Sequence, residues 1–171
     1  ILVTAPAGYG KTTLLSQCYS RIVKENHRVA WLSLHKQQKN PLSFLYYLVG
    51  ALDKQVACKL EAVDQLLDLP EESAREAISD LLLLNLSKFE KKITLILDDL
   101  HETEAPKIMH MLEYLIDNLP DNVTLLIGSR GNISLPLTHH RISGLLMELN
   151  IVDLKFRPNE AKVFFDRALP E

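Results

Sequence analysis

Residues that could together bind a phosphorylated ligand begin near the start of the chain. The stretch "GYGKTT", residues 8–13, directly follows the apolar run "ILVTA". Gly8 and Gly10 allow a backbone turn whose N–H groups point towards an anion. The helix expected to begin near Lys11 adds the positive end of its dipole at the same position. We therefore predict a phosphate-binding loop at residues 5–13.

The side chains of this loop have separate predicted roles. Lys11 would contact the β and γ phosphates of a nucleotide, the Thr12 hydroxyl would bind Mg²⁺, and Thr13 would hydrogen-bond an α-phosphate oxygen. Tyr9 would either shield the nucleotide or only fill the turn. The phosphate-loop pattern begins with glycine, and this chain has Ala5 there. The predicted cofactor-binding residues are Ala7, Gly8, Tyr9, Gly10, Lys11, Thr12 and Thr13. The alternative is an ordinary strand–turn–helix junction with an incidental lysine.

A pair of carboxylates supplies the second element of the predicted site. Asp98 and Asp99 end the apolar run in "LILDDLH". Asp98 would hold Mg²⁺, since a hard cation bound mainly by phosphate oxygens needs few protein ligands. Asp99 would orient or activate the water that attacks the γ phosphate. The alternative is an aspartate pair that only ends a strand and caps the next segment. His101 would either contact this pair or have a packing role.

Arg130, which follows Ser129 at the end of "VTLLIGSR", is the third candidate. A guanidinium there would sense the γ phosphate or stabilise charge during transfer, or would form a structural salt bridge instead. The predicted catalytic residues are Asp99 and Arg130, and the predicted metal ligands are Thr12 and Asp98. The adjacent His139 and His140 are interpreted as solvated loop residues.

The pattern of apolar residues predicts the elements that must position these side chains. Nearly continuous apolar runs predict strands at 1–5, 29–34, 93–98 and 123–129, with 145–150 as a fifth. Helices are predicted at 11–24, 41–57, 71–88, 106–118 and 158–169. This alternation predicts an α/β fold, a three-layer P-loop NTPase with a mainly parallel five-stranded sheet. Ligands of such sheets bind beyond the carboxyl ends of the strands, where the three candidates would meet.

The order of the strands also follows from the spacing of the motifs. A strand and two helical patterns separate the glycine loop from Asp98. This leaves room for an inserted strand between the loop strand and the acidic strand, and residues 123–129 are the natural candidate. We therefore predict the layout of the additional-strand (ASCE) ATPases.

The composition restricts the classes of protein that the chain could represent. Its 171 residues, 47% of them hydrophobic and 24% charged, suit one globular domain spanning 1–171. The net charge of -3 argues against nucleic-acid binding by this segment. Cys18 and Cys58 lack metal or redox spacing, which favours a cytoplasmic location. Apolar runs fall short of the ~20 residues that span a bilayer, so no membrane partner is expected. Because the chain has no initial Met and opens inside a strand, we interpret it as part of a longer protein.

Several blocks of the sequence occur in an order that resembles a known family. They are "APAGYGKTTLLSQ", "VAWLSL", "NPLSFLYYL", "LILDDLH", "LLIGSR" and "LKFRPNEAKVFF". The chain resembles the MalT-like, LuxR-type large ATP-binding transcription regulators, which are multidomain signal-transduction ATPases (STAND). By position, the residues that match the family motifs are Gly8, Gly10, Lys11, Thr12 and Thr13 in the loop, Asp98 and Asp99 in the acidic pair, and Arg130. Cys18 departs from the usual tryptophan, and Arg141 matches a block to which we assign a structural role.

The resemblance implies an ATP/ADP switch that uses Mg²⁺, with slow ATP hydrolysis controlling activation. It also implies winged-helix, helical-repeat and DNA-binding domains beyond residues 1–171, an unknown inducer, and ATP-dependent self-association of the full-length protein. DNA would be bound through the C-terminal domain of that protein.

Two other classes of function stay open. A P-loop small-molecule kinase should carry an arginine-rich lid over its substrate. Residues 131–144, the candidate segment for such a lid, contain a single arginine, Arg141. A nucleotide-binding scaffold domain would hold partners without switching.

Overall fold

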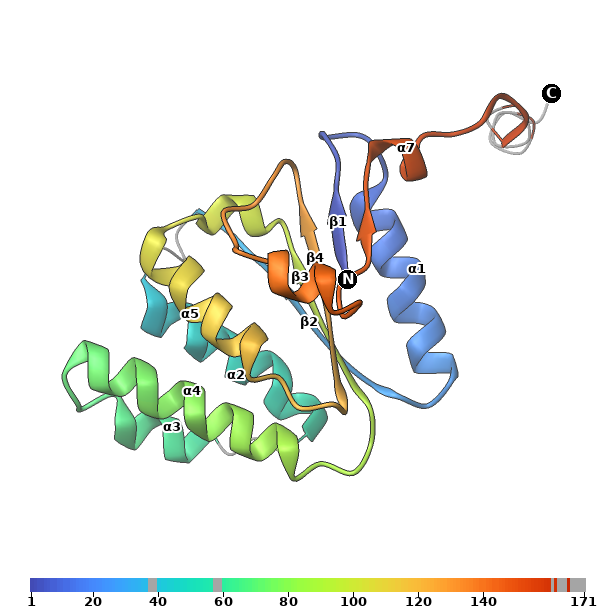
Figure 1. Cartoon of the computed structure of the whole chain (residues 1–171). Helices are drawn as coiled ribbons and strands as arrows, with labels where there is room; N and C mark the ends of the chain where they lie inside the picture. The colour runs from blue at the N-terminus through green and yellow to red at the C-terminus, as the bar shows by residue number, and fades with distance from the viewer. Residues whose placement is uncertain (37–39, 57–59, 161, 163–165, 167–171) are drawn as a thin grey trace.

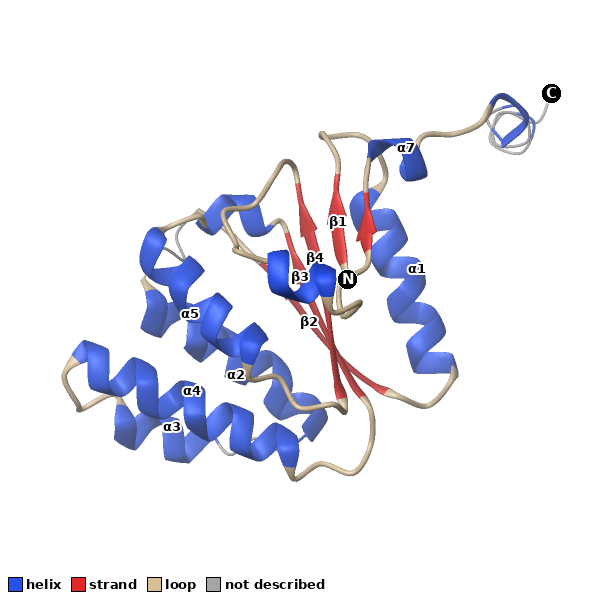
Figure 2. Cartoon of the chain, viewed as in Figure 1, coloured by secondary structure: helices blue, strands red, loops and turns tan. Residues whose placement is uncertain are grey.

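The computed structural model describes residues 1–36, 40–56, 60–160, 162 and 166. A five-stranded parallel sheet lies between helices on its two faces (Figures 1 and 2). The strands are β1 (Leu2–Thr4), β2 (Arg28–Ser33), β3 (Ile93–Asp98), β4 (Val123–Ser129) and β5 (Glu148–Leu149). The predicted α/β class and parallel sheet are therefore confirmed. The first and fifth strands are shorter than predicted.

The strand order across the sheet is β2-β3-β4-β1-β5. Strand β4 thus lies between the loop strand β1 and the acidic strand β3, which confirms the predicted inserted strand. The register pairs Thr4 with Ser129 and Ser33 with Asp98. Because all the strands are parallel, the ends of β1, β3 and β4 lie at one edge of the sheet.

The helices are α1 (Lys11–Lys24), α2 (Pro41–Val56), α3 (Leu60–Leu66), α4 (Glu71–Ser87), the 3₁₀ helix η1 (Leu100–Thr103), α5 (Pro106–Asp117), α6 (Thr138–Ile142) and α7 (Ile151–Leu154). The four longer helices, α1, α2, α4 and α5, agree closely with the predicted amphipathic segments. The sequence did not predict α3, η1, α6 or α7, which are all shorter than eight residues. The helix predicted at 158–169 lies largely outside the described residues. None of the helices in the described ranges is long and apolar enough to cross a membrane.

The start of α2 shows how local sequence sets an element. The side-chain oxygen of Asn40 accepts hydrogen bonds from the backbone N–H groups of Leu42 and Ser43, at 2.8 and 3.2 Å. Pro41 occupies the first helical position, where a missing N–H costs nothing. The predicted cap and proline therefore define this helix end.

Two apolar layers hold the helices against the sheet. Helix α1 covers one face, where Leu15 packs with Val3, Ile96 and Leu126. Helices α2, α4 and α5 cover the other face and contribute residues such as Phe44, Leu48, Ile78 and Leu112. Successive side chains of β3 alternate between the layers, as the pleat of a strand requires. The sheet is therefore buried on both faces, which explains its continuous apolar strands.

The region around α6 corrects one prediction. His139 and His140 lie in this helix and not in a solvated loop. The side chain of His140 is only 15% exposed, and its Nε2 lies 3.4 Å from Asp117 Oδ1 on α5. Arg141 donates two hydrogen bonds to the Glu148 carboxylate, of 2.8 and 2.7 Å, so α6 is tied to β5. Neighbours on a short helix face different ways, which leaves His139 exposed.

Candidate functional site

The turn between β1 and α1 has the backbone conformation that an anion-binding loop needs. Gly8 and Gly10 have φ values of 85° and 77°, in the left-handed region that L side chains rarely adopt. Nothing lies within 4 Å of the place where a Cβ would stand at either glycine. Glycine is thus required here by backbone conformation and not by crowding. Ala5 is buried, and it is not among the non-glycine residues with positive φ in the described ranges, Asn26 and Asp99. Alanine is therefore tolerated at the first position of the motif.

The N-terminus of α1 is open to an anion. Its cap residue, Gly10, makes no side-chain capping hydrogen bond, and no acidic residue lies in the first turn. The carbonyl of Gly10 accepts the first helical hydrogen bond, from Leu14 N–H at 2.8 Å. The preceding N–H groups have no intrahelical partner, and the helix dipole favours a negative ligand beside them. Backbone and dipole therefore offer one electropositive position.

Lys11 lies folded against this loop. It is buried, and its Nζ donates hydrogen bonds to the carbonyl oxygens of Ala5 and Pro6, at 2.7 and 2.9 Å. Burial lowers the pKa of Lys11; the negative charges of Asp99 and Asp98 oppose this shift, and Arg130 adds to it. All these groups act on one ammonium because the ends of β1, β3 and β4 converge.

The two predicted metal ligands meet directly. Thr12 Oγ1 donates a 2.9 Å hydrogen bond to Asp98 Oδ2, and the backbone N–H of Asp99 donates to Asp98 Oδ1 at 3.0 Å. Asp98 is only 2% exposed. Burial raises the pKa of Asp98, and the hydrogen bond from Thr12 opposes the shift, whereas the charge of Asp99 adds to it. A hydroxyl and a carboxylate are hard oxygen donors, so this pair fits a Mg²⁺ ion.

Gly128 makes the contact between these two ligands sterically feasible. It lies in β4, the strand that separates the acidic strand from the loop strand. A Cβ on Gly128 would lie 2.9 Å from Asp98 Oδ1 and 2.9 Å from Leu15 Cδ1. Gly128 is not among the residues predicted from the sequence. An isolated glycine inside an apolar strand is a known sign of close approach, and it would have identified the position.

The other predicted residues lie around the same edge. Asp99 has a left-handed backbone, with φ 58°, and begins η1. Ser129 is fully buried, and within the described ranges its hydroxyl has no hydrogen-bond partner, although its carbonyl accepts from Ala5 N–H at 3.3 Å. Arg130 follows as an exposed cation. Ala7, Gly8, Tyr9, Gly10, Thr12 and Thr13 are exposed along the loop and the first turn of α1. The structure thus gathers the predicted residues at one sheet edge.

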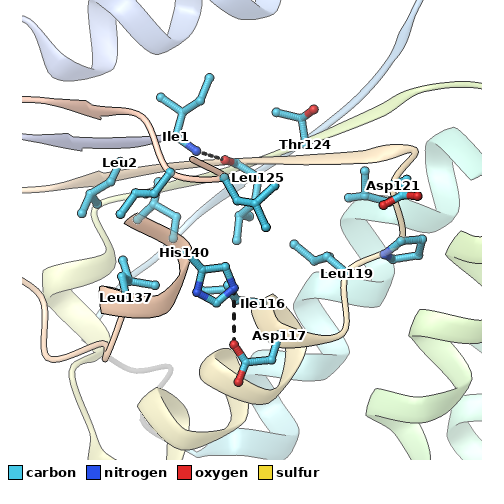
Figure 3. Close-up of a pocket in the computed structure, with 15 residues that line it drawn as sticks. Ile1, Leu2, Ile116, Asp117, Leu119, Asp121, Thr124, Leu125, Leu137 and His140 are labelled. Carbon is cyan, nitrogen blue, oxygen red and sulfur yellow. Dashed lines mark hydrogen bonds and ion pairs between the residues drawn. The ribbon is translucent and has the colours of Figure 1, made fainter. Parts of the chain in front are cut away.

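A hollow lies near the beginnings of β1 and β4, away from this edge (Figure 3). It has a volume of about 350 Å³ and a mainly apolar lining that includes Leu125, Leu137 and Ile116. His140 and Asp117 form its ion pair. None of the predicted site residues line it, so it is a separate feature of the fold.

Comparison with known proteins assigns the chain to a family. The model of the family described as "Nephrocystin 3, N-terminal" matches residues 1–130. The chain belongs to the nephrocystin 3 N-terminal family. This match covers the loop, the acidic pair and Arg130. The assignment is consistent with a P-loop NTPase domain.

The chain is also similar to curated transcription regulators. It is 28% identical over 166 residues to the HTH-type transcriptional regulator MalT of two Klebsiella pneumoniae strains. That alignment covers 97% of the chain but only 18% of each regulator, so the chain spans less than a fifth of their length. The resemblance to the LuxR-type regulators is therefore confirmed.

Two solved structures with a similar fold are those of ORC proteins bound to DNA. The Aeropyrum pernix ORC1 protein in complex with DNA superposes with a TM-score of 0.56 at 15% identity, covering 97% of this chain and 42% of that one. Drosophila ORC bound to GC-rich DNA and Cdc6 gives 0.52 at 12% identity, covering 98% and 27%. At such identities the likeness concerns the fold alone. The similarity to MalT supports a nucleotide-binding, ATPase-like domain.

Proposed function

We propose that the site binds an adenine nucleotide together with Mg²⁺ and acts as an ATP/ADP switch with slow hydrolysis. The observation that carries this proposal is the 2.9 Å hydrogen bond between Thr12 and Asp98, beside a glycine loop that holds Lys11. The bond joins the two oxygen donors that a phosphate-bound Mg²⁺ would need. An ordinary strand–turn–helix junction does not explain why Thr12 and Asp98, which lie on either side of β4, are in contact.

Each residue has a role in this proposal. The N–H groups of residues 7–13 and the Lys11 ammonium bind the phosphates, and Tyr9 shields them from water. Thr12 and Asp98 hold the metal ion, which neutralises phosphate charge when bound. Asp99 orients the attacking water, and Arg130 stabilises charge on the γ phosphate. Fast phosphoryl transfer commonly uses an additional arginine, worth about 10³ to 10⁵ in rate. Among the described residues, Arg130 is the one further cation whose charge acts on Lys11. Slow turnover is therefore expected.

The kinase alternative has less support. A lid over a transferred phosphoryl group needs free cations, and Arg141 is the only arginine in residues 131–144. Its guanidinium is already bound by two hydrogen bonds to Glu148. A scaffold that binds no nucleotide does not account for the buried carboxylate of Asp98, which costs free energy without a cation. A nucleotide-binding scaffold would hold partners without switching, and it would then bind ATP and ADP alike.

The wider biology belongs to the same proposal. Similarity to MalT supports a role in transcription regulation by the full-length protein, with DNA bound through other domains and activity set by an unidentified inducer. Self-association with ATP and a cytoplasmic location are proposed on the same basis. The single P-loop NTPase domain at 1–171 would be the switch.

Calorimetric titration of ATP and ADP, with and without Mg²⁺, tests the proposal. Lys11→Ala removes a charge-assisted contact of roughly 1.5–3 kcal/mol, so ATP affinity should fall at least about tenfold. Lys24→Ala, at the far end of α1, is the matched control and should bind as the wild type does. Equal affinity of the wild type and Lys11→Ala would refute the assignment of the loop.

A further inference from the structure

His101 lies between two carboxylates next to the proposed site. Its Nδ1 is 3.8 Å from Asp99 Oδ1, and its Nε2 is 3.2 Å from Glu102 Oε1. The side chain is 18% exposed, and neither ring nitrogen is exposed or makes a hydrogen bond within the described ranges. Buried polar atoms are nearly always hydrogen-bonded, so two unsatisfied nitrogens facing carboxylates need an explanation.

The backbone around this imidazole is firmly held. His101 lies in η1, and the first and last residues of this helix, Leu100 and Thr103, are buried. Glu102 N–H donates to the Asp99 carbonyl at 2.9 Å, which closes the turn. The ring therefore extends from a fixed stretch of backbone, with one nitrogen facing each carboxylate. Glu102 is also 4.0 Å from Lys36 Nζ, beyond the end of β2.

Asp99 in turn depends on this ring. In the described part of the chain, no other lysine, arginine or histidine nitrogen lies within 4.0 Å of its carboxylate. The carboxylate is 35% exposed, so without a partner it would sample several rotamers. A group that orients water must be held within a fraction of an ångström of its working position. His101 is the available support.

We propose that His101 is a positioning residue that holds the Asp99 carboxylate in the direction needed to orient water. In this arrangement Nδ1 faces the Asp99 carboxylate at 3.8 Å, and Nε2 faces the Glu102 carboxylate at 3.2 Å. This inference rests on the proposed role of Asp99. A purely structural role, in which the ring only stabilises η1, is the competing explanation.

Two isosteric substitutions separate these explanations. The amide nitrogen of asparagine can take the position of Nδ1, and that of glutamine the position of Nε2. His101→Asn should keep the contact with Asp99 and retain turnover within about threefold of the wild type. His101→Gln should lose that contact and lower kcat about tenfold with an unchanged KM for ATP. His110→Asn is the matched control, since His110 is an exposed histidine beside Glu113 on α5.

The assay is steady-state hydrolysis of labelled ATP by the 171-residue chain over a range of ATP concentrations, with binding measured in parallel. Equal losses in His101→Asn and His101→Gln, or a change in KM alone, would overturn the inference. A second experiment, NMR spectroscopy of the histidine rings, does not depend on hydrolysis. Asp99→Asn should shift the ring ¹⁵N resonances of His101 and leave those of His110 unchanged. Unmoved His101 resonances would also overturn it. Failure of the wild type to bind ATP would instead refute the proposed function, and the spectra would still decide whether His101 supports Asp99.

Discussion

Gly128→Ala should destabilise the protein although it adds only one methyl group. The new Cβ would lie 2.9 Å from both Asp98 Oδ1 and Leu15 Cδ1, closer than real Cβ contacts. Leu15 is fully buried, and both carboxylate oxygens of Asp98 are already hydrogen-bonded, so neither can move freely. Overpacking of this kind costs about 1–3 kcal/mol.

Part of this cost is offset. Alanine loses less backbone entropy on folding than glycine, which is worth about 0.5–1 kcal/mol. We therefore expect a net loss of about 1 kcal/mol, at the centre of a range from about 0 to 2.5 kcal/mol, which lowers Tm by about 2–4 °C for a domain of this size. The affected carboxylate is the proposed Mg²⁺ ligand, so the Mg²⁺-dependent part of ATP binding should weaken as well.

Thermal unfolding followed by circular dichroism measures the effect. Gly50→Ala is the matched control, because Gly50 lies inside α2 with nothing within 4 Å of its would-be Cβ. That substitution should raise stability by about 0.5–1 kcal/mol. If Gly128→Ala unfolds at or above the wild-type temperature while Gly50→Ala behaves as expected, the steric reasoning at β4 is wrong.

The remaining predictions concern the acidic pair and nucleic acid. Asp98→Asn should abolish the Mg²⁺ dependence of ATP binding in calorimetry and yet raise the stability of the nucleotide-free protein. Because burial raises the pKa of Asp98 in the folded state, wild-type stability should fall as pH rises from the unfolded pKa through the folded one, and this slope should be smaller in Asp98→Asn. Asp99→Asn should bind ATP nearly normally but hydrolyse it more slowly; identical defects in the two variants would show that the roles are not separable. With a net charge of -3, the chain should give no sequence-dependent gel shift at physiological salt.

The sheet and its order could be predicted because they depend on strong, local signals. Buried parallel strands must be apolar along their whole length, as residues 93–98 are, and the helices between them must be amphipathic. The place of β4 followed from sequence spacing, since the chain between Lys11 and Asp98 is too long for adjacent strands. Because parallel strands end at the same edge of a sheet, the loop, the acidic pair and Arg130 could also be predicted to lie together there. Their chemical roles stay predictions.

Other features depend on contacts that no local pattern records. Helix α3 is a short segment whose burial of Val63 depends on the neighbouring helices. The pairing of His140 with Asp117 joins α6 to α5 and decides which of two adjacent histidines is buried. A glycine inside an apolar strand marks a close approach at Gly128, but only the structure shows that the atoms in question are Asp98 Oδ1 and Leu15 Cδ1.

The bonds from Lys11 to the Ala5 and Pro6 carbonyls have a consequence for the heat of ligand binding. When a phosphate binds the Lys11 ammonium, each new hydrogen bond replaces one that the ammonium already makes to a carbonyl oxygen. That carbonyl oxygen then hydrogen-bonds to water instead. The enthalpy of association is then the difference between two similar quantities, although the contact itself is strong. The side chain is also confined before the ligand arrives, so little rotamer entropy is lost on binding. Affinity at this loop should therefore be dominated by entropy, including the release of water and counterions from the polyphosphate.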